Sequence, residues 1–396
     1  MKTVGIICEY NPFHKGHLYH LQEARKTTQS DYVVAIMSGD FVQRGEPAMM
    51  DKYLRTKAAL DAGVDLVLEL PVSYSLSSAE DFAKGAVMSL NALGSVNSLC
   101  FGSETANLSE LTKFANFYDN EPEDYKQELK KQLKEGLSFP KARELATERC
   151  LGHSFVPQSN DILGISYIRA LQQTQSQMTP FVIKREGAGY NEEQLDNQFP
   201  SALSIRTEIN NSKTANVLAS SLPGAVLEQF TSSYNLRWPI TADDFSTAVF
   251  LLLTQKSVEE LVQIKDISLE LARRMKRNLH EFTSVTSFAM LIKHKQYTYT
   301  RIMRCFMQLV NGITEFQPPT YLRVLGLKKE ASCLLNSENR TLPIVQRIAG
   351  IEDKLDSNAY CALSQDIASH ALYRQVIYNK YQTLMENEYL APCIYQ

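Results

Sequence analysis

Short apolar runs alternate with amphipathic segments over roughly the first 200 residues of the chain. The apolar runs are rich in Val and Ile, which is typical of strands buried on both faces of a sheet; they lie at 4–8, 32–37, 64–70, 99–101 and 181–184. Helical spacing appears between them, at 16–27, 51–62, 78–93, across 123–150 and at 161–173. This alternation predicts a Rossmann-like α/β domain, in which helices cover a parallel sheet.

The spacing of hydrophobic positions changes after about residue 211. Strand-like runs become rare, and helical spacing dominates at 245–253, 258–279, 284–293, 299–310 and 359–386. The stretch 220–239 holds two prolines, several serines and the only tryptophan, which is typical of an irregular linker. We therefore expect an α/β domain over residues 1–215 and a mainly α-helical domain over residues 216–396.

Composition excludes several classes of protein. With 44% hydrophobic and 21% charged residues, the chain has an ordinary globular mix, which excludes intrinsic disorder. No run approaches the ~18 apolar residues that cross a bilayer, and the apolar start at 4–8 leads straight into polar residues, unlike a signal peptide. Seven scattered cysteines form no zinc-type pair and fit reduced thiols. A cytoplasmic protein with no membrane partner is expected.

The first predicted strand runs directly into a loop that carries two histidines around a glycine. A helix is predicted to open at Gly16, within the segment Glu9-Tyr10-Asn11-Pro12-Phe13-His14-Lys15-Gly16-His17. Glycine lets a phosphate approach the backbone closely, and a helix start is a ready anion site. The imidazoles of His14 and His17 can donate hydrogen bonds to oxygens that gain charge as a P–O bond breaks. The alternative is a turn with one buried and one surface histidine.

Polar motif residues follow the other predicted strands as well. Together these segments lie at 11–17, 38–46, 71–73, 102–104 and 185–190, each directly after a strand. Right-handed crossovers place such loops at one edge of a parallel sheet, and ligands bind at the carboxyl ends of its strands. The residues alone therefore predict a single site built from five loops.

The histidine loop resembles that of the nucleotidyltransferase superfamily, in which an H-x-G-H loop binds a nucleotide triphosphate. That superfamily has a later S-x-x-x-x-R motif at a helix start, which fits the segment Ser201-Ala202-Leu203-Ser204-Ile205-Arg206. The resemblance implies that hydroxyls such as that of Ser204, and the guanidinium of Arg206, hold the β- and γ-phosphates. Taken alone, the segment is an ordinary serine N-cap before a helix.

Further segments resemble the tRNA(Met) cytidine acetate ligase family. They are GIICEYNPFH (5–14), MSGDFVQRGEP (37–47), LELP (68–71), FGSE (101–104), SNDIL (159–163), KREGAGY (184–190) and YTYTR (297–301). The resemblance implies an ATP-dependent ligase that works in two steps. ATP and acetate would form acetyl-adenylate and pyrophosphate, and the acetyl group would then pass to N4 of the wobble cytidine of elongator tRNA(Met).

The same resemblance implies a set of residues that contact ATP. His14, His17, Lys15 and Asp40 would be catalytic. The expected ATP contacts are Ile7, Cys8, Glu9, Tyr10, Asn11, Pro12, Phe13, His14, Lys15, Gly16, His17, Leu18, His20, Gly102, Asn160, Arg185, Ser204 and Arg206.

Several of these assignments have plainer alternatives. Lys15 could be solvated, and His20 could simply pack. Asp40 could position Mg²⁺ or a hydroxyl, or it could cap its own turn. Asn160 could be the N-cap of the following helix, and Arg185 could form a salt bridge instead of binding a phosphate. Metal ligands cannot be read from the sequence, so Mg²⁺ is expected only as a partner of the ATP phosphates.

The predicted helical half carries an uneven distribution of charge. From Lys265 to Lys329 there are 12 lysines and arginines against 4 acidic residues, although the whole chain has a net charge of −3. Basic groups neutralise RNA phosphates and tyrosines stack on unpaired bases, whereas a solvated helix face is the ordinary alternative. With the resemblance, the expected tRNA contacts are Arg273, Arg274, Lys276, Arg277, Lys293, Lys295, Arg301 and Arg304.

Two other functions remain open at this point. One is a small-molecule nucleotidyltransferase acting on a cofactor precursor, although the ~190 residues beyond the α/β domain argue against it. The other is a non-catalytic RNA-binding protein, which would not need His14, Gly16, His17 and Arg206. No obligate protein partner is evident.

Overall fold

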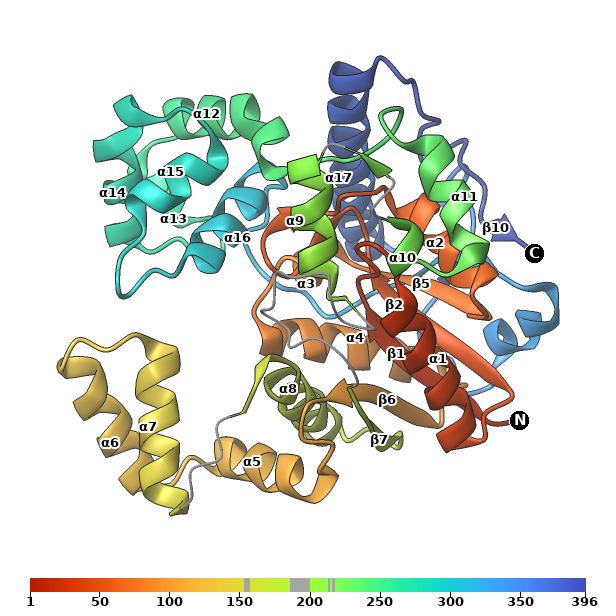
Figure 1. Cartoon of the computed structure of the whole chain (residues 1–396), viewed down its shortest axis with the longest axis horizontal. Helices are drawn as coiled ribbons and strands as arrows, with labels where there is room; N and C mark the ends of the chain where they lie inside the picture. Colours follow the sequence, from red (N-terminus) through yellow and green to blue (C-terminus); the bar gives the residue numbers. More distant parts are fainter. Residues whose placement is uncertain (153–156, 186–199, 213, 216–217) are drawn as a thin grey trace.

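A twisted sheet of eight strands forms the centre of the protein (Figure 1). The computed structural model describes residues 1–152, 157–185, 200–212, 214–215 and 218–396. The strands of the sheet are β1 Thr3–Cys8, β2 Tyr32–Ser38, β5 Leu66–Leu70, β6 Ser98–Ser103, β7 Thr179–Lys184, β8 Leu322–Leu327, β9 Ile344–Val345 and β10 Ile394–Tyr395. A small separate hairpin pairs β3 Phe41–Val42 with β4 Glu46–Pro47.

The order of the strands creates a natural binding position. It runs β10-β8-β5-β2-β1-β6-β7, with β9 beside β8. The five strands expected from the sequence (β1, β2, β5, β6 and β7) pair in parallel, which confirms the α/β prediction. The chain winds from β1 outward through β2 and β5, then crosses to β6 and β7 on the other side of β1. Ligands bind at such a reversal, outside the carboxyl ends of the strands.

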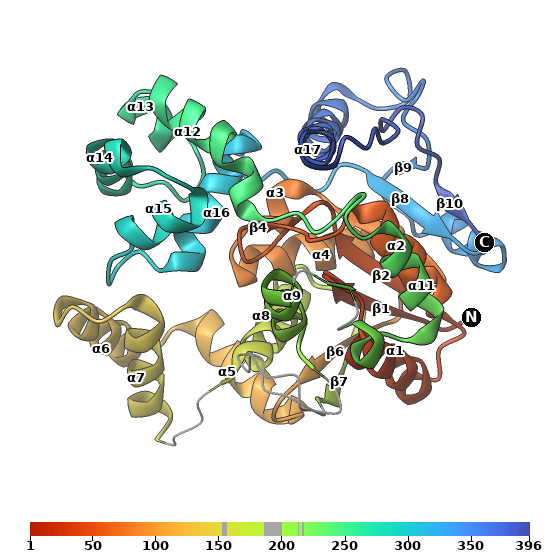
Figure 2. The same ribbon diagram turned by 45° about the horizontal axis from the view of Figure 1, so that its top comes forward.

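Helices cover both faces of this sheet (Figures 1 and 2). Side chains alternate along β2, so that Val34 and Ile36 pack with α4, α5 and α8, while Val33 and Ala35 pack with α1, α2 and α11. The helices of this part are α1 Lys15–Thr28, α2 Lys52–Asp61, α3 Val72–Ser75, α4 Ala79–Leu93, α5 Leu108–Asn120, α6 Glu123–Lys134, α7 Phe139–Leu151, α8 Ser159–Gln173, α9 Ala202–Ser212, α10 Leu218–Ser221 and α11 Gly224–Ser233.

The second half is mainly helical, as predicted, and its helices pack around a second core, which Phe41 and Val72 of the first half also enter. Val249, Leu271, Phe288 and Phe306 are buried together in this core. No helix in the described ranges is long and apolar enough to span a membrane. The helices are α12 Ser246–Gln255, α13 Val258–Val262, α14 Leu269–Asn278, α15 Val285–Ile292, α16 Tyr299–Val310 and α17 Ser357–Tyr381, with 3-10 turns at Ala242–Phe245, Leu279–Glu281 and Lys329–Asn336.

Two local predictions in this half were wrong. The expected linker at 220–239 contains α11. Its Val226 and Phe230 are buried in the same core as residues of β1, β2 and α2. The single helix expected at 258–279 is two helices, because Asp266 has a positive φ of 66° and Ser268 caps a new helix through the amide of Leu271.

The last part of the chain returns to the sheet. Strand β8 is buried along its length and pairs antiparallel with β5, and β10 pairs with β8. Residues 216–396 therefore add the strands β8, β9 and β10 to the main sheet besides forming the helices expected from the sequence. Because β8 is a single six-residue run among helices, its apolar pattern did not distinguish it from a buried helix segment.

Candidate functional site

A pocket opens at the carboxyl ends of β1, β6 and β7, beside the point where the strand order reverses. Loops that are far apart in the sequence form its walls, as the strand-end argument predicted. Of the ATP contacts expected from the sequence, those that line it are Ile7, Cys8, Glu9, Tyr10, Asn11, His14, Gly16, His17, His20, Gly102, Asn160, Arg185 and Arg206. Their roles toward ATP stay predictions at this stage.

The two histidines of the loop are held by reciprocal hydrogen bonds at the start of α1. His14 Nδ1 accepts the amide N–H of Gly16 at 3.1 Å, and His17 Nδ1 accepts the amide N–H of His14 at 3.3 Å. The rings stack with their centroids 3.7 Å apart. Each Nδ1 is an acceptor, so a neutral ring must carry its proton on Nε2. The capping box therefore presets two Nε2–H donors side by side.

Electrostatics keep these rings neutral in the free protein. Burial, and then the charges of Arg185 and Arg206, lower the pKa of His14 to about 3. Burial and its neighbours His14, Arg185 and His20 lower the pKa of His17 well below its usual value. The first helical amides were expected to face an anion, but Gly16 donates to His14 Nδ1 and His17 N donates to His14 O. The imidazoles are therefore the better-placed donors.

Two arginines flank the histidines. Arg206 donates to the backbone oxygen of Asn11 at 2.8 Å, which attaches α9 to the histidine loop. Arg185 lies 3.8 Å from the carboxylate of Glu104 and donates to Asn160 Oδ1 at 3.4 Å. A Cβ on Gly102 would lie 3.2 Å from Arg185 Cγ, so the glycine leaves room for this side chain.

The opposite wall is organised by Glu104. Its carboxylate accepts the amide N–H groups of Asn160 at 3.1 Å and Asp161 at 3.0 Å, which satisfies the start of α8. Asn160 is therefore not the N-cap that the sequence allowed as an alternative; Gln158 occupies that position. Glu186 and the rest of 186–199, which include part of the KREGAGY segment, lie outside the described residues.

Some expected ATP contacts lie away from the pocket. Lys15 Nζ donates to the backbone oxygen of Ser220 at 2.6 Å. Ser204 is fully buried, and its hydroxyl donates to the backbone oxygen of Ser201 at 2.8 Å, so it braces the start of α9. Pro12, Phe13 and Leu18 do not line the pocket either, and the side chains of Phe13 and Leu18 pack into the core instead.

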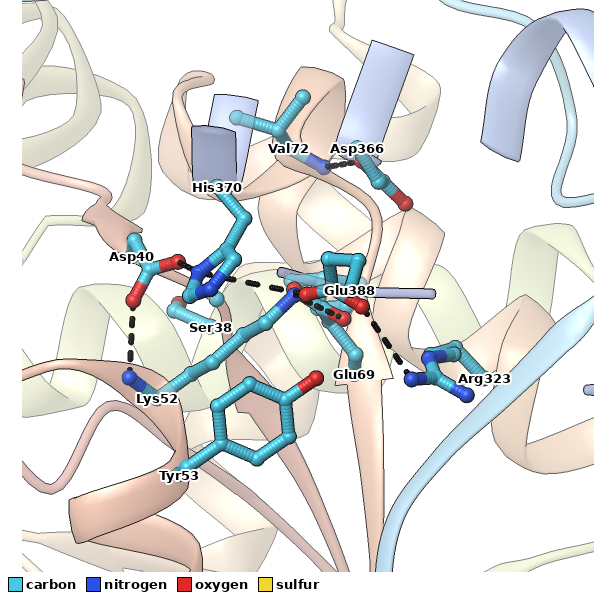
Figure 3. A network of polar contacts seen from close by, with 12 residues as sticks. Ser38, Asp40, Lys52, Tyr53, Glu69, Val72, Arg323, Asp366, His370 and Glu388 are labelled. Carbon is cyan, nitrogen blue, oxygen red and sulfur yellow. Dashed lines mark hydrogen bonds and ion pairs between the residues drawn. The ribbon is translucent and has the colours of Figure 1, made fainter. Parts of the chain in front are cut away.

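Asp40 also belongs to a different place, a buried charge cluster at the ends of β2, β5 and β8 (Figure 3). Its carboxylate accepts His370 Nδ1 at 2.6 Å and the amide of Lys52 at 2.8 Å. Burial works to raise the pKa of Asp40, but the charges of His370 and Lys52 outweigh it and lower the pKa to about 2. The catalytic assignment of Asp40 is therefore not supported by its position, since it does not line the pocket.

The sequence prediction missed the residues that join these two regions. Gln43 and Arg44, from the β3–β4 hairpin, line the pocket. Arg55 is fully buried on α2 and donates to the backbone oxygens of Glu9 at 2.7 Å and Ser38 at 2.9 Å, which ties the ends of β1 and β2 together. Gln43 and Arg44 lie in the MSGDFVQRGEP segment, so that strand-end motif was the available signal. Arg55 lies in an ordinary helical pattern, and no sequence signal marked it as part of the site.

The expected tRNA contacts divide into two groups. Arg274 and Lys276 tie the helices together, because they donate to the backbone oxygens of Ile292 and Leu253. Arg301 donates to the oxygen of Asp266. Arg304 has a buried Nε. The exposed members are Arg273, Arg277, Lys293 and Lys295.

Comparisons with known proteins agree with this geometry. The model of the HIGH nucleotidyl transferase family matches residues 1–388. The tRNA(Met) cytidine acetate ligase of Thermoanaerobacter sp. (strain X514) is 40% identical over 369 residues, which cover 90% of this chain and 91% of that protein. The one from Acetivibrio thermocellus is 38% identical over 395 residues and 94% of each chain. The chain belongs to the tRNA(Met) cytidine acetate ligase family.

Solved structures extend the likeness to the whole fold. The apo crystal structure of Thermotoga maritima TmcAL matches with a TM-score of 0.92 at 31% identity, covering 100% of this chain and 99% of that one. A structure of Thermotoga maritima TmcAL bound with alpha-thio ATP matches with a TM-score of 0.89 at 30% identity. The family resemblance and the nucleotidyltransferase fold expected from the sequence are thus confirmed.

The described residues of this family member hold no group of three or more His, Cys, Asp or Glu side chains that could cage a metal ion. Glu9 is the one carboxylate among the residues that line the pocket. Mg²⁺ commonly binds through substrate phosphates with only one or two carboxylates, so the pocket is compatible with an ion carried by a nucleotide. Magnesium itself stays a prediction.

Proposed function

We propose that this protein is an ATP-dependent ligase that activates acetate as acetyl-adenylate and transfers the acetyl group to N4 of the wobble cytidine of elongator tRNA(Met). The observation that carries the proposal is the preset pair of Nε2–H donors on His14 and His17, at the strand-order reversal and beside Arg206. The names of the relatives supply the substrate class.

In the first step an acetate oxygen attacks the α-phosphorus of ATP, and the bond to pyrophosphate breaks. Acetate is already an anion and needs no general base, so the barrier comes from anion–anion repulsion and from charge on the leaving group. Neutral Nε2–H donors and guanidinium groups oppose both, and they need no reorganisation because the capping box holds them in place. His14, His17 and Arg206 would act on the phosphates in this way.

The second step needs the cytidine to reach the same pocket. A wobble base is unpaired in the free tRNA and can turn out of its stack toward a protein site. The exposed basic residues of α14 and the loop after α15 are proposed to hold the RNA backbone, which is the sequence-independent part of such binding. The seven free cysteines in the described residues support a reducing compartment, and we propose the cytoplasm.

One experiment tests the proposal against its alternatives. The protein is incubated with ATP, labelled acetate and elongator tRNA(Met), and the digested tRNA is analysed for N4-acetylcytidine by mass spectrometry. Product is expected only when all three substrates are present, with AMP and pyrophosphate released in equal amounts. Tight tRNA binding without acetylation would favour a non-catalytic RNA-binding protein. Acetylation from acetyl-coenzyme A with no need for ATP would also overturn the proposal.

A further inference from the structure

We infer that Glu9 is the general base of the acetyl-transfer step, in which its carboxylate accepts the proton that N4 of the cytidine loses. The inference rests on the proposed function and adds a catalytic role to a residue expected only to contact ATP. It follows from where this carboxylate lies, from the lack of another carboxylate among the described residues that line the pocket, and from the hairpin that links it to the basic helices.

Glu9 is placed at the end of β1, directly before the histidine loop. One carboxylate oxygen, Oε1, accepts the backbone N–H of Gln43 at 2.8 Å, which fixes the side chain at the wall of the pocket. The side chain is half-buried. No other Asp or Glu among the described residues lines this pocket. The carboxylate of Glu104 does not line the pocket and already accepts the amide N–H groups of Asn160 and Asp161.

The Glu9 wall faces the helical half of the molecule. Gln43 lies in the β3–β4 hairpin, whose turn at Gly45 has a φ of +80°. A Cβ on Gly45 would come within 2.2 Å of the backbone nitrogen of Arg304, so the hairpin lies directly on α16. Contacts therefore run from α16 through the hairpin to Glu9. The hairpin thus links the Glu9 corner of the pocket to the helices that carry the basic residues.

The histidines cannot readily replace Glu9 as proton acceptor. Nδ1 of His14 and of His17 is already used by a backbone N–H, and in the neutral ring the remaining nitrogen carries a proton. His20 lies one turn further along α1, near Gly102, and burial together with Arg185 lowers its pKa to about 4. The imidazoles are therefore placed to donate hydrogen bonds to phosphate oxygens, whereas the Glu9 carboxylate is placed to accept a proton from N4.

The surroundings of Glu9 suit a base. Burial raises the pKa of Glu9 above its usual value, although the Gln43 N–H and the charges of Arg206, Arg44 and Arg55 work in the opposite direction. A carboxylate that is less acidic than an exposed one is a stronger proton acceptor. The three nearby guanidinium groups also limit its repulsion of the phosphate chain.

The transfer step balances with Glu9 in this role. The N4 lone pair forms the new C–N bond at the acetyl carbon of acetyl-adenylate. The bond from that carbon to the bridging oxygen breaks, and AMP leaves with the electron pair as an anion that needs no proton at neutral pH. One N4 proton passes to a carboxylate oxygen of Glu9 and then to solvent. Without this acceptor the nitrogen, which becomes positively charged when the C–N bond forms, would keep both protons and would be expelled again.

Single-turnover transfer from synthetic acetyl-adenylate to tRNA(Met) tests the inference, because it bypasses adenylate formation. Glu9→Gln keeps an oxygen for the Gln43 N–H but removes the base. Its transfer rate is expected to fall by ~10²–10⁴-fold, which is the usual range for a lost general base, and to lose the wild-type increase with pH. The matched control is Glu46→Gln. Glu46 lies in the β3–β4 hairpin that carries Gln43 but does not line the pocket, so this variant should transfer at the wild-type rate.

The remaining outcomes separate this inference from the proposed function. Wild-type transfer by Glu9→Gln, or a pH dependence that survives the substitution, would overturn the role of Glu9 while leaving the ligase intact. A wild-type protein that transfers nothing from acetyl-adenylate would instead sink the proposed function. Should Glu9→Gln fail to fold, Glu9→Asp gives the same decision, since a shorter base should transfer slowly yet retain the pH dependence.

Discussion

Two neighbouring regions at the carboxyl edge of the sheet differ in how their ionisable side chains are paired. In the pocket beside β1 and β6, His14 and His17 stay neutral, and Arg185 lies 3.8 Å from the carboxylate of Glu104. In the buried cluster beside β2, β5 and β8, Lys52 contacts both Glu69 and Glu388, and Arg323 contacts Glu388 (Figure 3).

The difference indicates which region binds a ligand. A buried cation whose charge is already matched by carboxylates has little left to offer an anion, and such a pair costs desolvation that only its partner offsets. Preorganised donors that are neutral, or arginines that are paired only loosely, are suited to an incoming phosphate. Polar residues gathered at strand ends are therefore not enough to assign a site, as Asp40 illustrates. Their internal pairing decides it.

The largest expected effect is on stability, from Lys52→Ala in the buried cluster. Lys52 Nζ lies 2.8 Å from Glu69 and also contacts Glu388, with all three side chains almost fully buried. Removing it takes the ammonium from both carboxylates, of which only Glu388 keeps a cation, Arg323, so the free energy of unfolding should fall by ~3–5 kcal/mol. Urea denaturation measures the change.

The same helix provides the control for that variant. Lys57 is exposed on α2 and pairs with Asp61 four residues along, so Lys57→Ala should cost only ~0.3–0.5 kcal/mol. Equal, small losses for the two substitutions would show that the buried cluster is no more than a set of surface-like ion pairs, and the comparison between the regions would fail.

In the pocket, His17→Ala should leave the fold intact and reduce acetate-dependent pyrophosphate release. Loss of one preorganised donor typically costs ~10²–10³-fold in rate. The matched control is His280→Ala, whose side chain is 74% exposed and far from the pocket lining. Pyrophosphate release at the wild-type rate from His17→Ala, at an unchanged melting temperature, would count against the phosphate role.

The pocket was predictable from sequence because each of its parts follows a strand. A parallel sheet with right-handed crossovers brings such ends together whatever the loops contain. His14, Gly102, Asn160 and Arg185 therefore converge as expected, although they span more than 170 residues of the chain. What the pattern could not give was the detailed role, such as Gly102 making room for Arg185.

The buried cluster was not predictable in the same way. His370 reaches Asp40 across 330 positions in the sequence, and β8 supplies Arg323 from a run that reads equally well as a helix segment. No local pattern marks a pairing between a strand-end loop and a helix near the end of the chain. Lys52, at the start of α2, looks like any polar residue of a surface helix until its burial is known.

Acid should weaken the cluster through Glu388. Burial works to raise the pKa of Glu388, but the charges of Lys52, His370 and Arg323 lower the pKa to about 2. A carboxyl with a depressed pKa contributes stability above its unfolded pKa of about 4.3 and loses it as the pH falls toward 2. The loss should be smaller than for Lys52→Ala, because acid neutralises Glu388 instead of leaving it charged without Lys52.

Acid titration of the free energy of unfolding between pH 5 and 2 checks this, with Glu388→Gln as the comparison. The variant should be less stable near pH 6 and should show a flatter acid limb than the wild type, since one of the carboxyls that must be protonated is gone. An identical slope in both proteins would mean that other carboxyls dominate the acid limb and that Glu388 is not held as its contacts indicate.

The smallest expected effect is on tRNA affinity, and it tests the exposed arginines of α14 rather than those that bond to backbone oxygens. Arg273 and Arg277 are exposed on α14, so the double variant Arg273→Ala, Arg277→Ala should remove about two phosphate contacts. The slope of log affinity for tRNA against log salt should become shallower by ~1.4–1.8, with adenylate formation unaffected. Lys26→Ala on α1, which lies on the other side of the molecule (Figure 1), should leave that slope unchanged. If the double variant keeps the wild-type slope, α14 is a solvated face and the RNA is held elsewhere.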